Sequence, residues 1–224
     1  MSTVRLQVPL RPRARITGPV SGTLYPVDRQ GYVRVDETDV AGLLLDGFGR
    51  ALESTDTAGA VATGAAAVEY GDRRLHQTVL TIDTVLPAIA GGANLAVGKL
   101  LYTFPAGEIM VEAASMSLAI TQTEGNITAD TPDGGLGTVI GSGVVATLDG
   151  TATFENILTG QTFNDCDGTA EVKSAIPTGA VPLIIAAGAA HTVYFNVADG
   201  WAASGDAGAL LTGTVTLHWR KLNG

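Results

Sequence analysis

The residues best suited to chemistry are acids at the start of the one stretch with helical character. The segment VRVDETDVAGLLLDGFGR, residues 33–50, contains Asp36, Glu37, Asp39 and Asp46. Clustered carboxylates can act as general acids and bases. However, Asp36 also stands where a helix N-cap is expected, and Asp39 stands three residues on, where a capping-box acid would lie. We therefore expect a short, capped helix in preference to a carboxylate site.

The rest of this segment has the pattern of a helix that packs on one side. Val40, Leu43 and Leu44 recur at helical spacing. Gly47 fits the left-handed C′ position, and Phe48 can fold back on the last turn. The segment is therefore expected to belong to a compact module.

Two glycine-rich segments resemble nucleotide-binding loops but do not meet their requirements. GGANLAVGKL has Ala93 where a P-loop needs glycine and Leu100 where Ser or Thr would bind magnesium. GGLGTVIGSGVV has Ile140 where a dinucleotide-binding loop needs its third glycine. We interpret the first as a turn entering a strand and the second as two strands or a bulged strand. No nucleotide cofactor is expected.

Candidate metal ligands are scattered. None of the three histidines has a histidine or cysteine three or four positions away, so a zinc site would need three strands to converge. NDCDGTAE offers Asp165, Asp167 and Glu171 as oxygen ligands of the kind that calcium takes, but Gly168 comes too early for an EF-hand loop. A turn is the favoured interpretation, calcium is the alternative, and no metal cofactor is expected.

One aromatic residue and one pair of acids complete the candidates. Trp201 lies in VADGWAASGDAG among small residues, where an indole can contact carbohydrate or protein. Glu108 and Glu112 are close in sequence, but a glycosidase needs two carboxylates held apart on rigid strands, and no pattern distinguishes these two from solvated acids. We assign no catalytic residue and do not expect an enzyme.

Composition favours a β-protein with a core. The 224 residues include 29 Gly and 27 Thr but only 3 Lys, and 46% are hydrophobic, which favours turns and strands and argues against disorder. A chain of this length buries a core without disulfides, and the single Cys166 cannot form an internal bridge. The sequence predicts neither a signal peptide nor a membrane span.

The charge is unevenly placed. Residues 1–74 hold nine Arg and nine acids, whereas residues 75–219 hold two Lys and thirteen acids, a net charge of −11. The acidic part would repel nucleic acid. The N-terminus is basic, because four arginines precede the first acid: Arg5, Arg11, Arg13 and Arg15.

Hydrophobic periodicity predicts the architecture. RLHQTVLTIDTV alternates, with Leu80 and Ile82 on one face, and GTVTLHW places Val215, Leu217 and Trp219 on one face. EIMVEAASMSLAIT predicts one face made of Met110, Glu112, Ala114, Met116, Leu118 and Ile120. Seven or so short strands predict a mainly β protein, an antiparallel β-sandwich that is jelly-roll-like. The expected divisions are an extended arm (1–20), a hairpin and helix module (21–53), a linker (54–72) and the sandwich (73–224).

Several segments together resemble structural proteins of tailed bacteriophages. They are LHQTVLTIDTVLPAI, GKLLYTFPAGEIMVEAASMSLAI, GLGTVIGSGVVATLDGT and the final GTVTLHW. YPVDRQGYVRVDETDVAGLLLDGF also resembles a small module of phage head proteins. The resemblance lies in pattern and turn layout and covers most of the chain.

This resemblance implies a virion component, most similar to a capsid decoration or cement protein. Such a protein is expected on the capsid surface of the virion, after synthesis in the host cytoplasm, as a homotrimer that binds the major capsid protein through many weak contacts. Nucleic acid and membranes are not expected partners. The alternative is a receptor- or glycan-binding virion protein from a head fibre, tail or baseplate, with Trp201 at its binding face. The residues expected to dock on the capsid are Arg5, Arg11, Arg13, Arg15, Leu43 and Phe48.

Overall fold

The computed structural model describes residues 3–7, 15–27, 32–45, 49–50, 59–71, 76–148, 153–175 and 182–222. The chain divides into two compact units. The N-terminal unit is residues 1–58 with 69–76, and the large unit is residues 59–68 with 77–224. In the part of the chain that the structure describes, no helix has the length and apolar character needed to cross a membrane.

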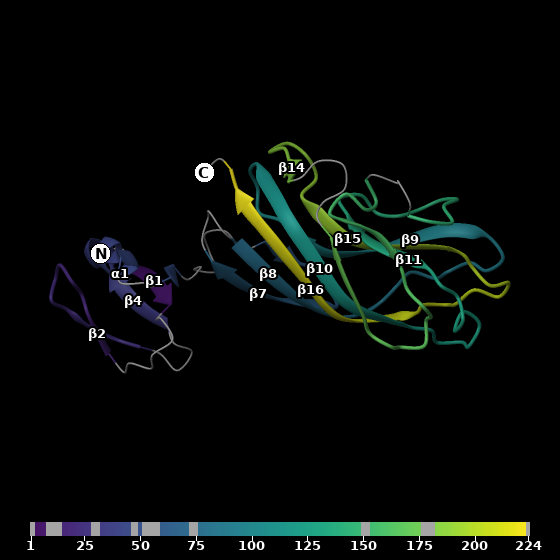
Figure 1. Ribbon diagram of the computed structural model, residues 1–224, viewed down its shortest axis with the longest axis horizontal. Helices are drawn as coiled ribbons and strands as arrows, with labels where there is room; N and C mark the ends of the chain where they lie inside the picture. Colours follow the sequence, from purple (N-terminus) through teal and green to yellow (C-terminus); the bar gives the residue numbers. More distant parts are fainter. Residues whose placement is uncertain are drawn as a thin grey trace. The chain divides into compact units, whose positions relative to one another are not determined.

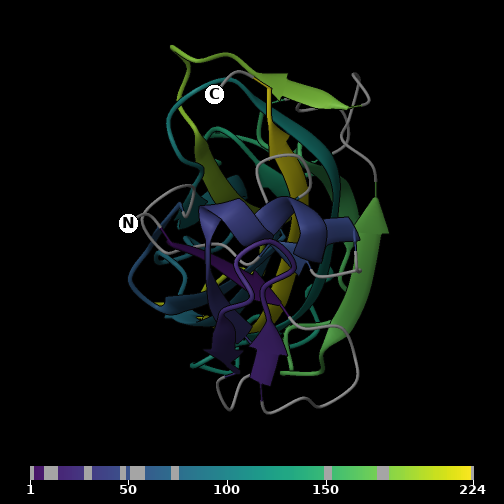
Figure 2. The same cartoon turned by 90° about the vertical axis from the view of Figure 1, so that its left-hand side faces the viewer.

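The N-terminal unit combines a small sheet, a hairpin and a helix. Its sheet has the order β4-β1-β5, from β1 (Thr3–Gln7), β4 (Tyr32–Asp36) and β5 (Gly49–Arg50). The hairpin pairs β2 (Arg15–Thr17) with β3 (Leu24–Pro26), and α1 (Glu37–Leu45) lies beside β1 and β4 (Figures 1 and 2). Six buried side chains form its core: Leu6, Ile16, Val33, Val35, Val40 and Leu43.

Where the structure describes residues 1–20, at 3–7 and 15–20, they do not form the extended arm that the sequence suggested. β1 pairs antiparallel with β4 from Thr3↔Asp36 to Gln7↔Tyr32, and Leu6 is fully buried. Apolar Val4 and Leu6 alternate with polar neighbours, so this stretch has the period of a strand, which the prolines and arginines around it concealed.

The large unit is an antiparallel β-sandwich, as predicted (Figure 1). One sheet has the order β13-β10-β16-β8-β7, with β14 beside β10, and the other has the order β12-β11-β15-β9-β6. The strands of the first sheet are β7 (Ala65–Gly71), β8 (His76–Val85), β10 (Ile109–Thr121), β13 (Glu171–Ala175), β14 (Leu183–Ile185) and β16 (Leu210–Lys221). Those of the second are β6 (Ala60–Val61), β9 (Asn94–Thr103), β11 (Asp133–Gly137), β12 (Leu158–Thr162) and β15 (Thr192–Gly200).

The prediction of a linker at residues 54–72 is wrong for the part of this segment that the structure describes. Residues 60–61 and 65–71 are β6 and β7, and each joins a different sheet of the sandwich. Ala65 and Ala67 pack against the core while Ala66 and Val68 are exposed. Alanine has a low strand propensity, so the sequence alone gave a weak signal for this edge strand.

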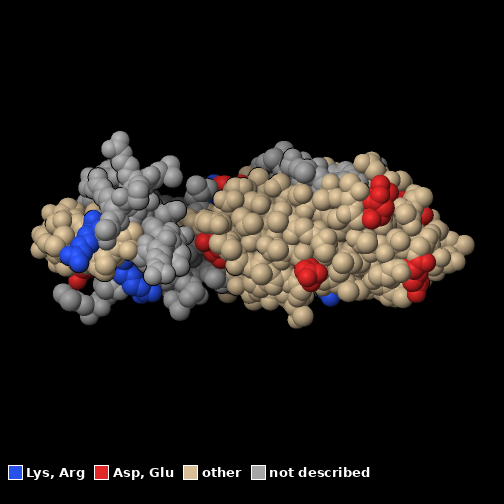
Figure 3. Space-filling model, turned by 90° about the horizontal axis from the view of Figure 1, so that it is seen from below, with Lys and Arg blue, Asp and Glu red and all other residues tan. Residues whose placement is uncertain are grey.

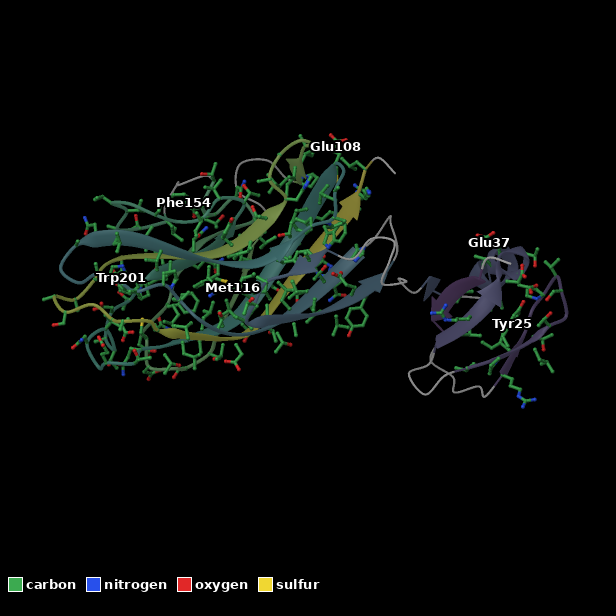
Figure 4. The ribbon with its side chains drawn as sticks, turned by 180° about the vertical axis from the view of Figure 1, so that it is seen from behind. Tyr25, Glu37, Glu108, Met116, Phe154 and Trp201 are labelled. Carbon is green, nitrogen blue, oxygen red and sulfur yellow. The ribbon has the colours of Figure 1, made fainter. Side chains whose placement is uncertain are left out.

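The core between the sheets is aromatic at its centre. Trp219 of β16 is fully buried, its ring centroid lies 5.3 Å from that of Phe104, and its Nε1 donates to Thr78 Oγ1 at 2.9 Å. The predicted alternation is confirmed on β8 and β16, where Leu80, Ile82, Val215, Leu217 and Trp219 are buried. Met116, labelled in Figure 4, is buried on β10.

A β-bulge changes the face that β10 presents to this core. The pairing of β10 with β16 shifts between Val111 and Ala113, so Ile109 and Val111 are buried together with Ala114 and Met116. The uninterrupted alternation expected for this strand, which placed Met110 and Glu112 with the buried residues, is therefore wrong before the bulge and right after it.

Candidate interaction surface

The acids at the start of α1 have structural roles. Asp36 caps the helix, because its Oδ1 accepts from the Thr38 backbone N–H at 3.1 Å and from the Thr38 hydroxyl at 3.0 Å. Asp39 does not complete a capping box. Its carboxylate instead accepts from the backbone N–H groups of Val20 and Ser21, at 2.7 and 2.9 Å, and from the Ser21 hydroxyl at 2.5 Å.

Tyr25 joins the hairpin to the helix start. Its hydroxyl donates to Asp39 Oδ2 at 2.8 Å and accepts from the Asp36 backbone N–H at 3.2 Å (Figure 4 labels Tyr25). Burial alone would raise the pKa of Asp39, but the hydrogen bonds from Ser21, Tyr25 and Val20 outweigh it and lower the pKa from 3.8 to about 2. Asp39 is therefore an ionised anchor for the turn between β2 and β3.

A second carboxylate fixes loops of the large unit. Asp206 is 2% exposed and accepts from Thr123 N and Thr123 Oγ1, both at 2.8 Å, from Glu124 N at 3.1 Å and from Gly208 N at 2.9 Å. Burial acts to raise the pKa of Asp206, but the hydrogen bonds from Gly208, Thr123 and Glu124 outweigh it and lower the pKa. A carboxylate held this way stabilises loops and is poorly placed to exchange protons with a substrate.

Trp201 is not an exposed contact residue, which corrects the role proposed from the sequence. It is 2% exposed, and its Nε1 donates to the backbone oxygen of Leu95 at 2.8 Å (Figure 4 labels Trp201). The small residues around it make close packing of the loop backbone over the indole feasible. The small residues around Trp201, which suggested an exposed indole, therefore indicate close packing.

The calcium alternative gains no support from the loop that suggested it. Asp165 accepts from the backbone N–H of Asp167 at 3.2 Å, and Asp167 accepts from that of Thr169 at 2.8 Å. These are the short-range hydrogen bonds of Asx turns. Within the described ranges, no group of three or more His, Cys, Asp or Glu side chains is arranged to hold a metal ion.

The other acids and histidines considered from the sequence are not brought together. Glu112 pairs with Arg220 at 3.1 Å, and the His76 ring nitrogen lies 2.8 Å from Glu69 at a buried position. His191 and His218 are half-buried.

The structure places the residues that were predicted to dock on a capsid in different environments. Leu43 is 2% exposed and belongs to the core of the N-terminal unit, so its expected contact with a partner is wrong. Arg15 is exposed on β2. Arg5 lies in β1, where only its backbone is described, and Arg11, Arg13 and Phe48 lie outside the described residues. Docking through the arginines stays a prediction.

The most distinctive surface feature is a fixed loop with exposed aliphatic side chains, residues 138–145, which we call the valine loop. Val139 and Ile140 are 42% and 45% exposed, and Val144 is 86% exposed. The loop follows β11, in a region where the sequence suggested a strand; the strand ends at Gly137. The loop contains no charged residue.

A buried amide holds the valine loop in place. Asn196 of β15 is fully buried; its Oδ1 accepts from Gly141 N at 2.6 Å, and its Nδ2 donates to the backbone oxygens of Val139 at 2.9 Å and Phe154 at 2.6 Å. Gly98 of β9 lies beneath the valine loop. A Cβ added to Gly98 would collide with Asn196 Oδ1 and with the Ile140 side chain. The loop backbone is therefore fixed by a satisfied polar network against a glycine of β9.

Further hydrogen bonds and apolar packing secure both ends of the loop. Thr138 N donates to Asn156 Oδ1 at 2.9 Å, Thr192 Oγ1 donates to the Thr138 backbone oxygen at 2.9 Å, and Ala96 N donates to Gly143 O at 3.0 Å. Leu148 is buried with Ala96 and Ala198 in a separate cluster, against which Phe154 packs. The segment that contains the loop thus covers part of the outer face of the five-stranded sheet.

One feature of the sequence marks the residue that anchors this loop. Asn196 interrupts an apolar run in TVYFNVA, at a strand position whose neighbours Phe195 and Val197 are buried. A buried amide needs several partners, and nearby backbone can supply them. The partners themselves lie far away in sequence and could not be named without the fold.

Comparison with protein-family models, with curated proteins and with solved structures finds no match in any of the three.

Proposed function

We propose that this chain is a structural virion protein that binds and stabilises the surface of a phage capsid, as a decoration or cement protein. The observation that supports this proposal most strongly is the valine loop. It presents Val139, Ile140 and Val144 to solvent on a backbone that Asn196 fixes in advance. The described acids with the clearest geometry, Asp39 and Asp206, are engaged in holding loops.

A fixed apolar loop suits docking, because binding does not have to order the backbone again. Burying one valine side chain contributes about 1.5–3 kcal/mol. A single loop would bind weakly, but copies that touch several capsid subunits make later contacts effectively intramolecular, so modest contacts add to tight attachment. The homotrimer and the major capsid protein as partner belong to this proposal.

The receptor- or glycan-binding alternative loses its main residue, because Trp201 is buried. No other described residue specifically favours that alternative.

The test is occupancy on virions. The chain is located in purified particles by cryo-electron microscopy, and copies per particle are counted for the wild type, Ile140→Asp and Val144→Asp. We expect each substitution to reduce capsid affinity about ten- to a hundredfold, which is the loss of one buried valine-sized contact. The matched control is Val61→Asp, an exposed valine on β6 outside the loop that should keep full occupancy. Absence of the chain from the capsid, or unchanged occupancy in both loop variants, would refute the proposal.

A further inference from the structure

The two sheets of the sandwich differ in what covers their outer faces. The five-stranded sheet is covered in part by its own chain, where Leu148 and Ala198 are buried on its outer side. On the six-stranded sheet, the outward side chains of β7, β8 and β16 are half-buried or exposed, including Val68 at 53% and Val85 at 51% exposure. We call this second surface the outer face of the six-stranded sheet.

Many residues of this outer face are small, although Tyr70, Gln77, Met110 and His218 are larger, and most are uncharged. Ser115 of β10 lies opposite Thr216 of β16, and Ser117 lies opposite Thr214. Among the described outward positions of β7, β8, β10 and β16, the charged residues are Asp83 and the Glu112–Arg220 ion pair. Broad uncharged areas separated by a few acids are also visible on the large unit in Figure 3.

This lack of charge is notable in so acidic a chain. Residues 75–219 hold two Lys and thirteen acids, a net charge of −11. Two identical acidic units repel each other unless their contact excludes most of the acids. A basic partner would bind most favourably to an acidic surface, whereas a second copy of this acidic chain would bind most favourably to a surface with few charges. The outer face of the six-stranded sheet meets the second requirement.

The size of the face is also sufficient. β8 and β16 have 10 and 12 residues. Four neighbouring strands about ten residues long, with a rise of about 3.3 Å and a spacing of about 4.8 Å, give a footprint of about 600 Å² on each partner. The total of about 1,200 Å² from two copies reaches the lower end of stable, specific interfaces.

We infer that two copies of this chain pair through this face, six-stranded sheet against six-stranded sheet, with Val68 and Thr214 inside the contact. Small side chains allow two sheets to approach to about 10 Å, the usual spacing of packed sheets. The contact is self-complementary and gives a pair related by a twofold axis. It concerns the free chain in solution, where it gives a dimer, and it does not depend on capsid binding or on the trimer proposed for the capsid-bound protein.

The test is the mass in solution of the full chain, by sedimentation equilibrium up to about 100 µM, a concentration at which a weak but specific pair is populated. The wild type is expected to form a dimer. The double variant Val68→Asp/Thr214→Asp places new acids in the contact, and its dissociation constant should rise at least about a hundredfold. Because both positions are exposed, its circular dichroism and thermal midpoint should stay close to those of the wild type.

Two further variants make the test specific. Val144→Asp alters an exposed valine on the other side of the sandwich and should leave the dimer unchanged. Asp83→Asn removes the unpaired acid of the face and should tighten the dimer, most clearly at low salt. A monomeric wild type, a trimeric mass, or a double variant that dimerises as tightly as the wild type would overturn the inference. Virion occupancy of the loop variants is measured separately from the mass of the free chain, so failure of one proposal can be told from failure of the other.

Discussion

Asn196 and Gly141 lie 55 residues apart in sequence, yet the amide oxygen of Asn196 accepts the Gly141 backbone N–H at 2.6 Å at a buried position. This contact decides the conformation of the valine loop, because the same side chain also donates to the Val139 and Phe154 backbone oxygens. The loop and strand β15 therefore behave as one rigid element.

Replacing Asn196 by Ala should destabilise the large unit and loosen the loop. Three backbone groups, one of them fully buried, lose their partner, which we expect to reduce the free energy of unfolding by about 2–4 kcal/mol. Urea denaturation measures this loss, and hydrogen exchange at Val139 and Gly141 should become faster. Asn126→Ala, at an exposed loop position, is the matched control and should change stability by less than about 0.5 kcal/mol. Equal stability of the two variants would contradict the role given to Asn196.

Gly98 should tolerate no side chain. A Cβ there would collide with Asn196 Oδ1 and the Ile140 side chain, so Gly98→Ala is expected to cost about 1–3 kcal/mol by overpacking. Gly188 has open space around it, and Gly188→Ala should be close to neutral. Thermal unfolding of both variants checks this, and a Gly98→Ala variant as stable as the wild type would show that the loop can move away.

The Asp39 carboxylate should make the N-terminal unit sensitive to acid. Its pKa is about 2 when folded and 3.8 when unconstrained, so its contribution to stability is fully present above pH about 4 and is lost as the pH falls toward 2. Asp39→Asn should lower the thermal midpoint at pH 7 and weaken the acid dependence of the N-terminal unit between pH 5 and about 2. Tyr25→Phe should also lower the midpoint but keep the acid dependence, because the Val20 and Ser21 hydrogen bonds remain. An Asp39→Asn variant with an unchanged acid profile would rule this out.

Cys166 should be unreactive in the folded protein. Burial, together with the nearby carboxylates of Asp130 and Asp199, raises the pKa of its thiol from 9.0 to about 12, and its side chain is fully buried. Since the thiolate is the nucleophile that attacks thiol reagents, labelling at pH 8 should be negligible in the native state and rapid in urea. Fast native labelling would show that the loop around Cys166 opens.

The sequence predicted the sandwich well because its strands alternate strongly. The burial of Leu217 and Trp219 was predicted directly by the alternation of apolar and polar residues along the strand. The predicted buried face of β10 was wrong at the start of the strand. A bulge there adds one residue and exchanges the inward and outward positions, and no residue type in the sequence signals it.

Side-chain partners were less predictable than strands. Asp36 as a cap was confirmed because capping is local. Asp39, which binds a turn eighteen residues upstream, and Trp201, which bonds to Leu95 across the fold, could not be assigned because such contacts depend on tertiary structure.

The position of β16 also constrains how the large unit is made. This strand lies between β10 and β8, yet it is synthesised after both of them. While the ribosome is still translating residues before 210, β8 and β10 each present an open edge that only β16 can satisfy. The six-stranded sheet therefore cannot close during most of translation, and chains cut short before β16 would be prone to aggregate through those two edges.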